Sequence, residues 1–215
     1  LSLKYKSYWR KTGLKGRWGE VFLNHLNKHK PKKVMEIGVF CGVTAKNICD
    51  FLDKTHKGNY SYIGIDLFGE EKKNEDDEIE PEFLKNNKFS NPLKNLYYNI
   101  ILKENLNSIE SVRKFLNKYK DNINLIKGDT NIVLKTLNLS DVDYVFHDGG
   151  HSYNTVFNDL TTIFKILKGQ QKIFLCDDYG AESYIPDVKN AIDDFALTNK
   201  LKVKLIENRF AEIIT

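Results

Sequence analysis

The chain has 215 residues, of which 41% are hydrophobic and 29% are charged, and its formal net charge is +4 at pH 7. This composition is typical of a globular domain with a full core and excludes a wholly disordered chain. No apolar run approaches the roughly 20 residues of a membrane-spanning helix, and no signal-peptide pattern is present. We therefore expect one domain over residues 1–215, located in the cytoplasm, with no membrane span.

The positive charge is concentrated near the N-terminus, where residues 1–33 carry ten lysines and arginines against a single acid, Glu20. Such a segment can attract an anionic substrate or a nucleic acid. Lysine recurs along the whole chain, however, and no zinc-finger, basic-zipper or RNA-recognition pattern is present. We interpret the basic segment as solvated surface and expect no nucleic-acid partner.

Three cysteines, Cys41, Cys49 and Cys176, form no C-x-x-C pair and have no zinc-site spacing. Each lies in an apolar segment. We therefore expect three buried, reduced thiols without a chemical role, as in a cytoplasmic protein.

The first third of the chain alternates between helix and strand patterns. Apolar residues recur at helical spacing over residues 17–29, within an N-terminal helical segment that we place at residues 1–30. The pattern then predicts a strand over 33–37, a helix over 44–52 and a strand over 60–66 that ends in an acid.

Residues 67–107 interrupt this alternation with an acidic run, two prolines and an aromatic-rich piece that contains Tyr97 and Tyr98. A connection of this length is usually either functional or disordered. We expect an insertion that forms a lid or a subunit contact in a homo-oligomer, and its two tyrosines could stack on a ring of the substrate.

The second half of the chain is regular. The expected elements are a helix over 109–119, a strand over 123–127, a helix over 131–137, a strand over 142–148, a helix over 153–167, a strand over 172–177, a helix over 188–195 and a hairpin of 202–206 with 210–214. Alternation of this kind specifies an α/β fold: a mostly parallel sheet with helices on both faces, here ending in an antiparallel hairpin.

The link between the first strand and its helix reads Glu36-Ile37-Gly38-Val39-Phe40-Cys41-Gly42. Glycines there let the backbone pass close to a ligand over a helix N-terminus. Phe40 stands where the dinucleotide fingerprint G-x-G-x-x-G requires its second glycine, so a nicotinamide cofactor is not expected. The spacing E-x-G-x-x-x-G instead resembles the first motif of class I S-adenosylmethionine-dependent methyltransferases. That resemblance implies a Rossmann-like fold, with S-adenosylmethionine bound by Glu36, Gly38, Gly42 and Thr44.

Two further strand ends carry acids. Asp66 ends the second strand, where a carboxylate can accept hydrogen bonds from both ribose hydroxyls of a nucleotide cofactor. Asp129 and Thr130 follow the third strand, where the resemblance implies contacts with the adenine ring. Each acid could alternatively cap the next helix, but acids at successive strand ends favour a cofactor site.

Polar clusters follow the next two strands, namely Asp148-Gly149-Gly150-His151 and Asp177-Asp178. If both strands are parallel, three carboxylates and an imidazole gather at one edge of the sheet, where open α/β sheets bind ligands. Oxygen ligands suit a divalent cation such as Mg²⁺, and a neighbouring histidine can serve as a general base. The alternative is that Asp177 and Asp178 are turn and helix-cap residues.

Segments 143–153 and 177–180 resemble those of a subgroup of these enzymes, the metal-dependent macrolide-sugar and surface-glycan O-methyltransferases. The resemblance runs from about residue 31 to the C-terminus, outside 67–107. It implies that Asp148, Asp177 and Asp178 bind Mg²⁺, that Asp148 also borders the cofactor, and that His151 is the catalytic base.

The leading interpretation is O-methylation of a sugar hydroxyl, in a nucleotide-linked sugar or a surface-glycan precursor. A catechol-type or other small-molecule O-methyltransferase would use a similar metal site, although such enzymes resemble Asp-Asn where this chain has Asp177-Asp178. The N-P-P-Y pattern of amino-group methyltransferases is absent. A cofactor-binding module without catalysis is a third alternative.

The other histidines are expected to have no catalytic role. His147 precedes Asp148 within a strand, so its side chain should point to the opposite face of the sheet, into the core. His25, His29 and His56 lie on helices and are expected to be structural or surface residues.

Overall fold

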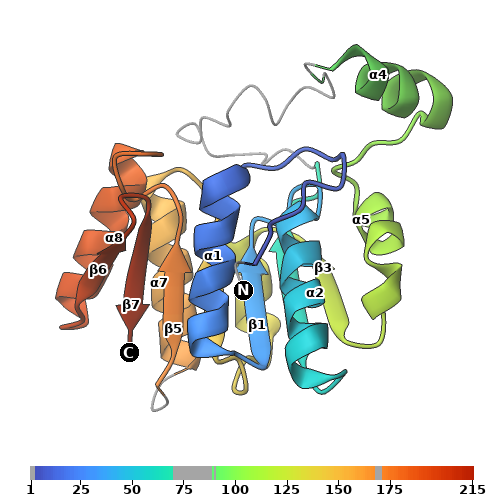
Figure 1. Cartoon of the computed structure of the whole chain (residues 1–215). Helices are drawn as coiled ribbons and strands as arrows, with labels where there is room; N and C mark the ends of the chain where they lie inside the picture. The colour runs from blue at the N-terminus through green and yellow to red at the C-terminus, as the bar shows by residue number, and fades with distance from the viewer. Residues whose placement is uncertain (1–2, 70–88, 90, 168–170) are drawn as a thin grey trace.

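The computed structural model describes residues 3–69, 89, 91–167 and 171–215, and these residues form one seven-stranded sheet wrapped by helices (Figure 1). The strand order is β3-β2-β1-β4-β5-β7-β6. The strands are β1 (Lys33–Ile37), β2 (Ser61–Asp66), β3 (Ile123–Lys127), β4 (Tyr144–His147), β5 (Ile173–Cys176), β6 (Val203–Ile206) and β7 (Phe210–Ile214).

The first five strands run parallel, and the last two form an antiparallel hairpin on the β5 edge. The hairpin turn places Glu207 and Asn208 at φ values of 50° and 64°, the left-handed pair that a tight hairpin favours. β1 lies next to β4, with Glu36 opposite Phe146. The order of the strands therefore reverses between β1 and β4, and open α/β sheets bind ligands at such a switch point.

Helices cover both faces of the sheet (Figure 1). One face carries α1 (Gly16–His29), α2 (Val43–His56) and α5 (Ile109–Phe115). The other carries α6 (Thr130–Val133), α7 (Tyr153–Ile166) and α8 (Pro186–Thr198). The remaining elements are α4 (Pro92–Asn95), the π-helix η1 (Leu96–Leu102) and two 3-10 turns, η2 (Asn117–Tyr119) and η3 (Leu134–Thr136).

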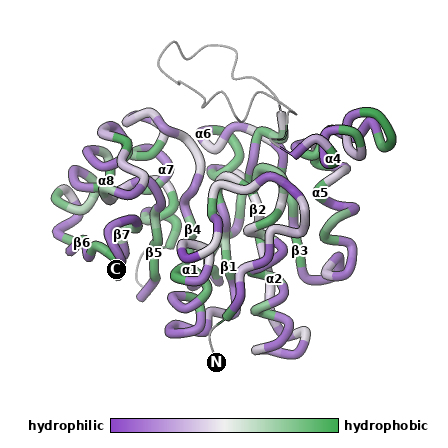
Figure 2. Tube along the Cα trace, turned by 45° about the horizontal axis from the view of Figure 1, so that its top comes forward, coloured by the Kyte–Doolittle hydropathy of each residue, from purple (hydrophilic) through white to green (hydrophobic). Residues whose placement is uncertain are grey.

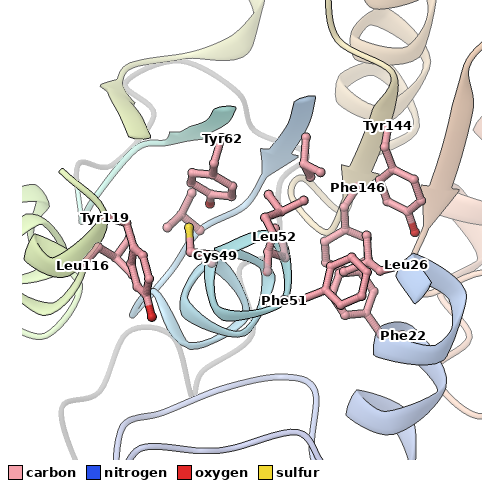
Figure 3. Close-up of a cluster of buried hydrophobic side chains, with 14 of the residues drawn as sticks. Phe22, Leu26, Cys49, Phe51, Leu52, Tyr62, Leu116, Tyr119, Tyr144 and Phe146 are labelled. Atoms are coloured by element: carbon pink, nitrogen blue, oxygen red, sulfur yellow. The ribbon is translucent and has the colours of Figure 1, made fainter. Parts of the chain in front are cut away.

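Large apolar side chains fill the space between the sheet and the α1–α2 layer (Figure 3). The rings of Phe22 on α1 and Phe146 on β4 have centroids 4.5 Å apart, and both side chains are fully buried. Burying a side chain of this size contributes about 1.5–3 kcal/mol, so this packing fixes α1 against the central strands. In Figure 2, β1 and β5 are largely hydrophobic, whereas hydrophilic stretches lie on the surrounding helices.

The expected α/β architecture, with helices on both faces and a C-terminal antiparallel hairpin, is confirmed. The helical segment expected over residues 1–30 is wrong in its first half, because α1 begins only at Gly16. Residues 3–15 form turns and irregular chain that lies along α2. There the Asn47 side chain accepts a hydrogen bond from the Lys6 amide at 2.9 Å and donates one to its carbonyl at 2.8 Å. These contacts satisfy both backbone groups of Lys6 without a helix.

Within the described part of the chain, no helix has both the length and the apolar character needed to cross a membrane.

Two loops at the carboxyl edge of the sheet touch through their backbones. Gly38, after β1, has a φ of +88°, and a Cβ atom added to it would lie 2.1 Å from the Asp148 carbonyl oxygen. Gly149, after β4, packs against Gly38 in return, since its added Cβ would lie 2.9 Å from the Gly38 nitrogen. The two loops can approach this closely only because neither glycine has a side chain.

We predict that Gly38→Ala lowers the free energy of unfolding more than Gly58→Ala does. The two glycines have similar φ values, +88° and +85°, so both variants should carry a left-handed strain of about 1–2 kcal/mol. Only Gly38 also meets backbone atoms, because an added Cβ at Gly58 finds nothing within 4 Å. Urea denaturation should show an extra loss on the order of 2 kcal/mol for Gly38→Ala. Equal losses in the two variants would contradict the backbone contact.

Candidate functional site

The carboxyl ends of the parallel strands bring the sequence-predicted residues to one edge of the sheet. The strand ladders continue one residue past the strand ends, where the amides of Gly38, Asp148 and Asp177 each donate to a carbonyl of the neighbouring strand at 2.9–3.0 Å. The loops after β1, β4 and β5 therefore leave the sheet at the same level.

Asp66, at the end of β2, organises residues 38–42, which we call the glycine loop. Its carboxylate accepts hydrogen bonds from the backbone amides of Phe40 at 2.7 Å and Phe68 at 2.6 Å. Phe40 has a φ of +50°, a strained left-handed conformation that this hydrogen bond helps to hold. Gly42, with a φ of +75°, is the N-cap of α2, so the loop leads directly onto a helix N-terminus.

Glu36 is a fully buried acid beneath this loop. Its Oε2 accepts a hydrogen bond from the Tyr62 hydroxyl, whereas its Oε1 has no hydrogen-bond partner among the described residues. Burial raises the pKa of the Glu36 carboxyl to about 8, although the Tyr62 hydrogen bond opposes the shift. An unpartnered carboxyl oxygen in the core indicates a place where a hydrogen-bond donor or a cation would be favourable.

The remaining predicted cofactor residues lie at two helix starts. Asp129 caps α6, because its carboxylate accepts a hydrogen bond from the Asn131 amide at 2.9 Å, and Thr130 is buried in the first turn of that helix. Thr44 is buried in the first turn of α2, with its hydroxyl 2.8 Å from the Tyr5 hydroxyl. The N-terminal segment therefore covers Thr44, and the structure does not present this residue to a ligand.

Asp148, Asp177 and Asp178 form a cluster of negative charge at the edge. Burial raises the pKa of Asp148 well above its usual value, and the charges of Asp177 and Asp178 raise it further. The Asp148 carboxylate accepts no hydrogen bond from any residue that the structure describes. Repulsion among neighbouring carboxylates favours a proton or a cation between them.

Arg209, on the turn before β7, binds one of these acids. Its Nε and a terminal nitrogen donate to different oxygens of Asp177, each at 2.6 Å, and both residues are buried. Arg209 has no counterpart among the sequence-predicted site residues. The signal that points to it is the register of the hairpin, in which Cys176 pairs with Ala211 and so brings Arg209 close to Asp177.

His151 lies beside Asp178. The His151 Nε2 and Asp178 Oδ2 atoms are 3.4 Å apart, with 21% and 19% of the two side chains exposed. Asp178 has a φ of +59°, a costly backbone conformation for a residue with a side chain, and such strain clusters at functional sites. The edge thus presents a histidine and an acid together, both accessible to solvent.

A buried arginine from the N-terminal segment supports the glycine loop. Arg10 donates to the carbonyl oxygens of Cys41 at 2.8 Å and Leu106 at 2.9 Å. It also donates to the Ser111 hydroxyl at 2.8 Å, and its guanidinium lies 4.4 Å from the centre of the Phe115 ring. These contacts tie the loop to the end of the 67–107 insertion, a role that no local pattern predicted.

The described end of that insertion carries α4 and η1 beyond the edge of the sheet, whereas residues 70–88 and 90 lie outside the described residues (Figure 1). Tyr98 is buried and stacks on Phe89, with ring centroids 5.3 Å apart. Tyr97 is 41% exposed and meets Trp9 edge-on at 6.4 Å. Tyr98 is therefore a packing residue, and only Tyr97 has the exposure that stacking on a substrate requires.

The histidines and cysteines away from the edge make internal contacts. His147 is 2% exposed and lies 3.2 Å from Asp159 on α7, as a core histidine should, and the three cysteines are buried and free. His25 and His29, which were expected to be structural or surface residues, both contact Glu212.

The spacing of possible metal ligands differs between the carboxyl edge of the sheet and the cluster around Glu212. Among the residues that the structure describes, only His25, His29 and Glu212 place three such ligand atoms within 4.8 Å of one another. The ligand atoms of Asp148, Asp177 and Asp178 are spaced more widely. The Asp177 carboxylate is also held in its ion pair with Arg209.

We predict that Glu36→Gln stabilises the protein increasingly as the pH rises from 4.5 to about 8. In this window the unfolded chain has released the Glu36 proton while the folded protein, with its raised pKa, retains it, so the wild type loses stability with rising pH. Glutamine keeps an acceptor for the Tyr62 hydroxyl but does not titrate. Denaturation at several pH values should show a stability difference that grows by on the order of 4 kcal/mol. The exposed Glu110→Gln is the control, and curves that stay parallel in all three proteins would rule out a proton-retaining Glu36.

The comparison with protein families agrees with this geometry. A family described as a methyltransferase domain matches residues 35–179, which include the glycine loop, Asp66, Asp148, His151 and Asp178. A search of curated proteins gives no match.

Solved structures with the same fold are methyltransferases of low sequence identity. The O-methyltransferase NovP has a TM-score of 0.62 at 16% identity over 91% of this chain and 80% of its own. A methyltransferase of Podospora anserina, PaMTH1, solved with bound SAH, has a TM-score of 0.58 at 17% identity. The match covers 93% of this chain and 79% of PaMTH1. CalS11, described as a TDP-rhamnose 3'-O-methyltransferase of calicheamicin biosynthesis, has a TM-score of 0.57 at 16% identity. The match covers 92% of this chain and 80% of CalS11.

These structures establish the shared Rossmann-like fold, and the family match covers well over half of the sequence. The chain therefore belongs to this methyltransferase family and is a methyltransferase.

Proposed function

We propose that the protein is an S-adenosylmethionine-dependent O-methyltransferase that acts on a sugar hydroxyl, in a nucleotide-linked sugar or a surface-glycan precursor. The observation that carries this proposal is the pair His151 and Asp178, 3.4 Å apart, on the same sheet edge as the glycine loop. Transfer to a weakly acidic hydroxyl needs a base beside the methyl donor. The similarity to CalS11 supports this class of substrate, because that protein is described as acting on TDP-rhamnose.

The residues around the glycine loop fit S-adenosylmethionine, which would supply the methyl group. A carboxylate offers about four acceptor positions. At Asp66 backbone amides use three of them, so a ribose hydroxyl can still donate to the Asp66 carboxylate. The unpartnered Oε1 of Glu36 suits the ammonium group at the amino-acid end of the cofactor. The proposed cofactor site further comprises Gly38, Gly42, Asp129, Thr130 and Asp148, and Thr44 joins it only if the Tyr5 contact opens.

The acidic cluster fits a divalent cation such as Mg²⁺ through two of its three members. Asp148 accepts no hydrogen bond from the described residues and Asp178 is partly exposed, and Mg²⁺ commonly binds one or two carboxylates together with waters. Asp177 would become a third ligand only if its ion pair with Arg209 opens. A cation bound there would lower the pKa of the acceptor hydroxyl.

His151 is the proposed catalytic base. Asp178 faces its Nε2 and favours the tautomer that carries a proton on that nitrogen, which leaves the lone pair of Nδ1 for the acceptor hydroxyl. As the hydroxyl proton moves to Nδ1, the Asp178 carboxylate stabilises the imidazolium that forms. Most of the rate then comes from holding the acceptor oxygen in line with the methyl group.

The insertion 67–107 is proposed to be a lid or a contact between subunits of a homo-oligomer within one methyltransferase domain, residues 1–215. It follows directly on Asp66, and its described end exposes Leu93, Ile100 and Ile101, each at 64%. Clustered apolar surface of this kind is usually covered by a partner or by closure. We place the enzyme in the cytoplasm, where its three free thiols would stay reduced.

Methyl transfer and cofactor binding test the proposal together. With labelled S-adenosylmethionine, we expect transfer to nucleotide-linked deoxysugars, loss of transfer in excess chelator and recovery on adding Mg²⁺. Calorimetry should show binding of S-adenosylhomocysteine that Asp66→Ala weakens. Transfer to catechols but not to sugars would replace the substrate assignment, and absence of S-adenosylhomocysteine binding would refute the proposed cofactor site.

We predict that His151→Ala lowers kcat by about 10²–10⁴-fold, the usual contribution of a positioned general base. S-adenosylhomocysteine affinity should stay close to that of the wild type, because His151 lies on the turn after β4 rather than in the glycine loop. His56→Ala is the matched control. The His56 ring lies 2.8 Å from the carbonyl oxygen of Pro31, which precedes β1, whereas the proposed site follows the other end of the parallel strands. A wild-type kcat in His151→Ala at neutral pH would exclude the base assignment.

A further inference from the structure

Three side chains from opposite ends of the chain converge at a second place, on the face of the sheet that α1 covers. His25 and His29 lie one turn apart on α1, and Glu212 lies on β7. The Glu212 Oε1 atom is 3.3 Å from His25 Nε2 and 3.0 Å from His29 Nε2. Glu212 is 2% exposed, so a buried carboxylate and two imidazole nitrogens face a common point.

His25 has an unpartnered nitrogen directed at this point. Its Nδ1 lies 2.8 Å from the hydroxyl of Tyr144, which Figure 3 shows beside Phe22 and Leu26 of α1. Its Nε2 is buried and has no hydrogen-bond partner among the described residues, although the Glu212 oxygen is only 3.3 Å away. Metal-binding histidines have this arrangement, with one ring nitrogen held by an outer partner and the other directed at the metal.

The two nitrogen-to-oxygen distances are close to those of a tetrahedral site, and all three ligand atoms lie within 4.8 Å of one another. Metal–ligand bonds of about 2.0–2.1 Å at tetrahedral angles place neighbouring ligand atoms roughly 3.3–3.4 Å apart. The two nitrogen-to-oxygen distances of 3.0 and 3.3 Å need to change by only a few tenths of an ångström. Two imidazoles and one carboxylate are the protein ligands of known zinc sites, which complete their coordination with water. His29, with 13% of its side chain exposed, lies on the side open to that water.

Two lysines also approach the carboxylate. Lys28 Nζ is 3.4 Å from Glu212 Oε1, and Lys204 Nζ is 3.8 Å from Oε2. Both distances exceed the 2.7–2.9 Å or so of a strong charge-assisted hydrogen bond. The lysine side chains are 57% and 68% exposed, so they can move into solvent at little cost when a cation takes their place.

We propose that His25, His29 and Glu212 bind one zinc ion that fastens α1 to strand β7. The site lies near the start of β4, where Tyr144 contacts His25, whereas Asp148 follows the other end of that strand. It is therefore distinct from the proposed methyl-transfer site and does not rest on that proposal. The ion would join the first helix to the last strand.

Zinc binding by the full-length protein tests this inference. Protein freed of metal by chelator and dialysis should bind one zinc ion per chain in calorimetry, and the ion should raise Tm. Co²⁺ in place of zinc should give the visible absorption of a tetrahedral site. His29→Gln and Glu212→Gln should each weaken zinc binding by more than roughly 10–100-fold, the effect of losing an outer partner of a ligand. The His29 variant is decisive because its side chain is the most exposed of the three and its loss leaves the core intact.

Two control variants locate the ion. His56→Gln removes a histidine outside the cluster and should bind zinc like the wild type. Asp178→Asn removes an acid of the proposed methyl-transfer site and should also retain zinc binding. Absence of saturable zinc binding in the wild type, or wild-type affinity in His29→Gln, would overturn the inference. Loss of zinc binding in Asp178→Asn alone would likewise overturn it, by assigning the ion to the acidic cluster.

Discussion

The close backbone contact between Gly38 and Gly149 is the constraint on which the site depends. It brings the glycine loop against the turn that carries Asp148 and His151, at the point where the strand order reverses. Arg10 fixes the same loop from the other side through the Cys41 carbonyl. Because the loop is held through its own backbone on both sides, it is positioned before any ligand arrives, and such preorganisation favours catalysis.

The neighbouring ends of β4 and β5 bring three carboxylates to the same edge. Arg209 neutralises Asp177 with two short hydrogen bonds, but burial and the neighbouring charges leave Asp148 with a strongly raised pKa. A partly buried carboxylate that accepts no hydrogen bond and faces other carboxylates is costly unless a proton or a cation joins it. Asp178, with its strained backbone, adds to that cost. Residues that are unfavourable for the fold alone are therefore the ones suited to binding a cation and a substrate.

The sequence predicted the parts of this arrangement that depend on local pattern. Asp66 and Asp148 follow short apolar strands, and alternation of strands with helices sufficed to place them at one edge. Arg209 could not be predicted in the same way, because its contact with Asp177 depends on the register of β7 against β5. The burial of Thr44 depends on the N-terminal segment, because Tyr5 of that segment packs over α2. The apolar periodicity of the first helix did not show that this segment is separate from the helix. Local pattern gives the position of a residue along an element, whereas these contacts arise from long-range packing.

The donor atoms at the two polar clusters suit different ions. The carboxyl edge offers oxygen ligands from Asp148 and Asp178, which favour Mg²⁺, an ion that keeps waters and exchanges readily. His25, His29 and Glu212 offer two imidazoles and a carboxylate, a set for which zinc competes far better than Mg²⁺. This difference would exclude Mg²⁺ from the site of His25, His29 and Glu212. Because α1 follows directly on the segment that carries Arg10 to the glycine loop, fixing the far end of α1 would also restrain the chain that supports the proposed cofactor site.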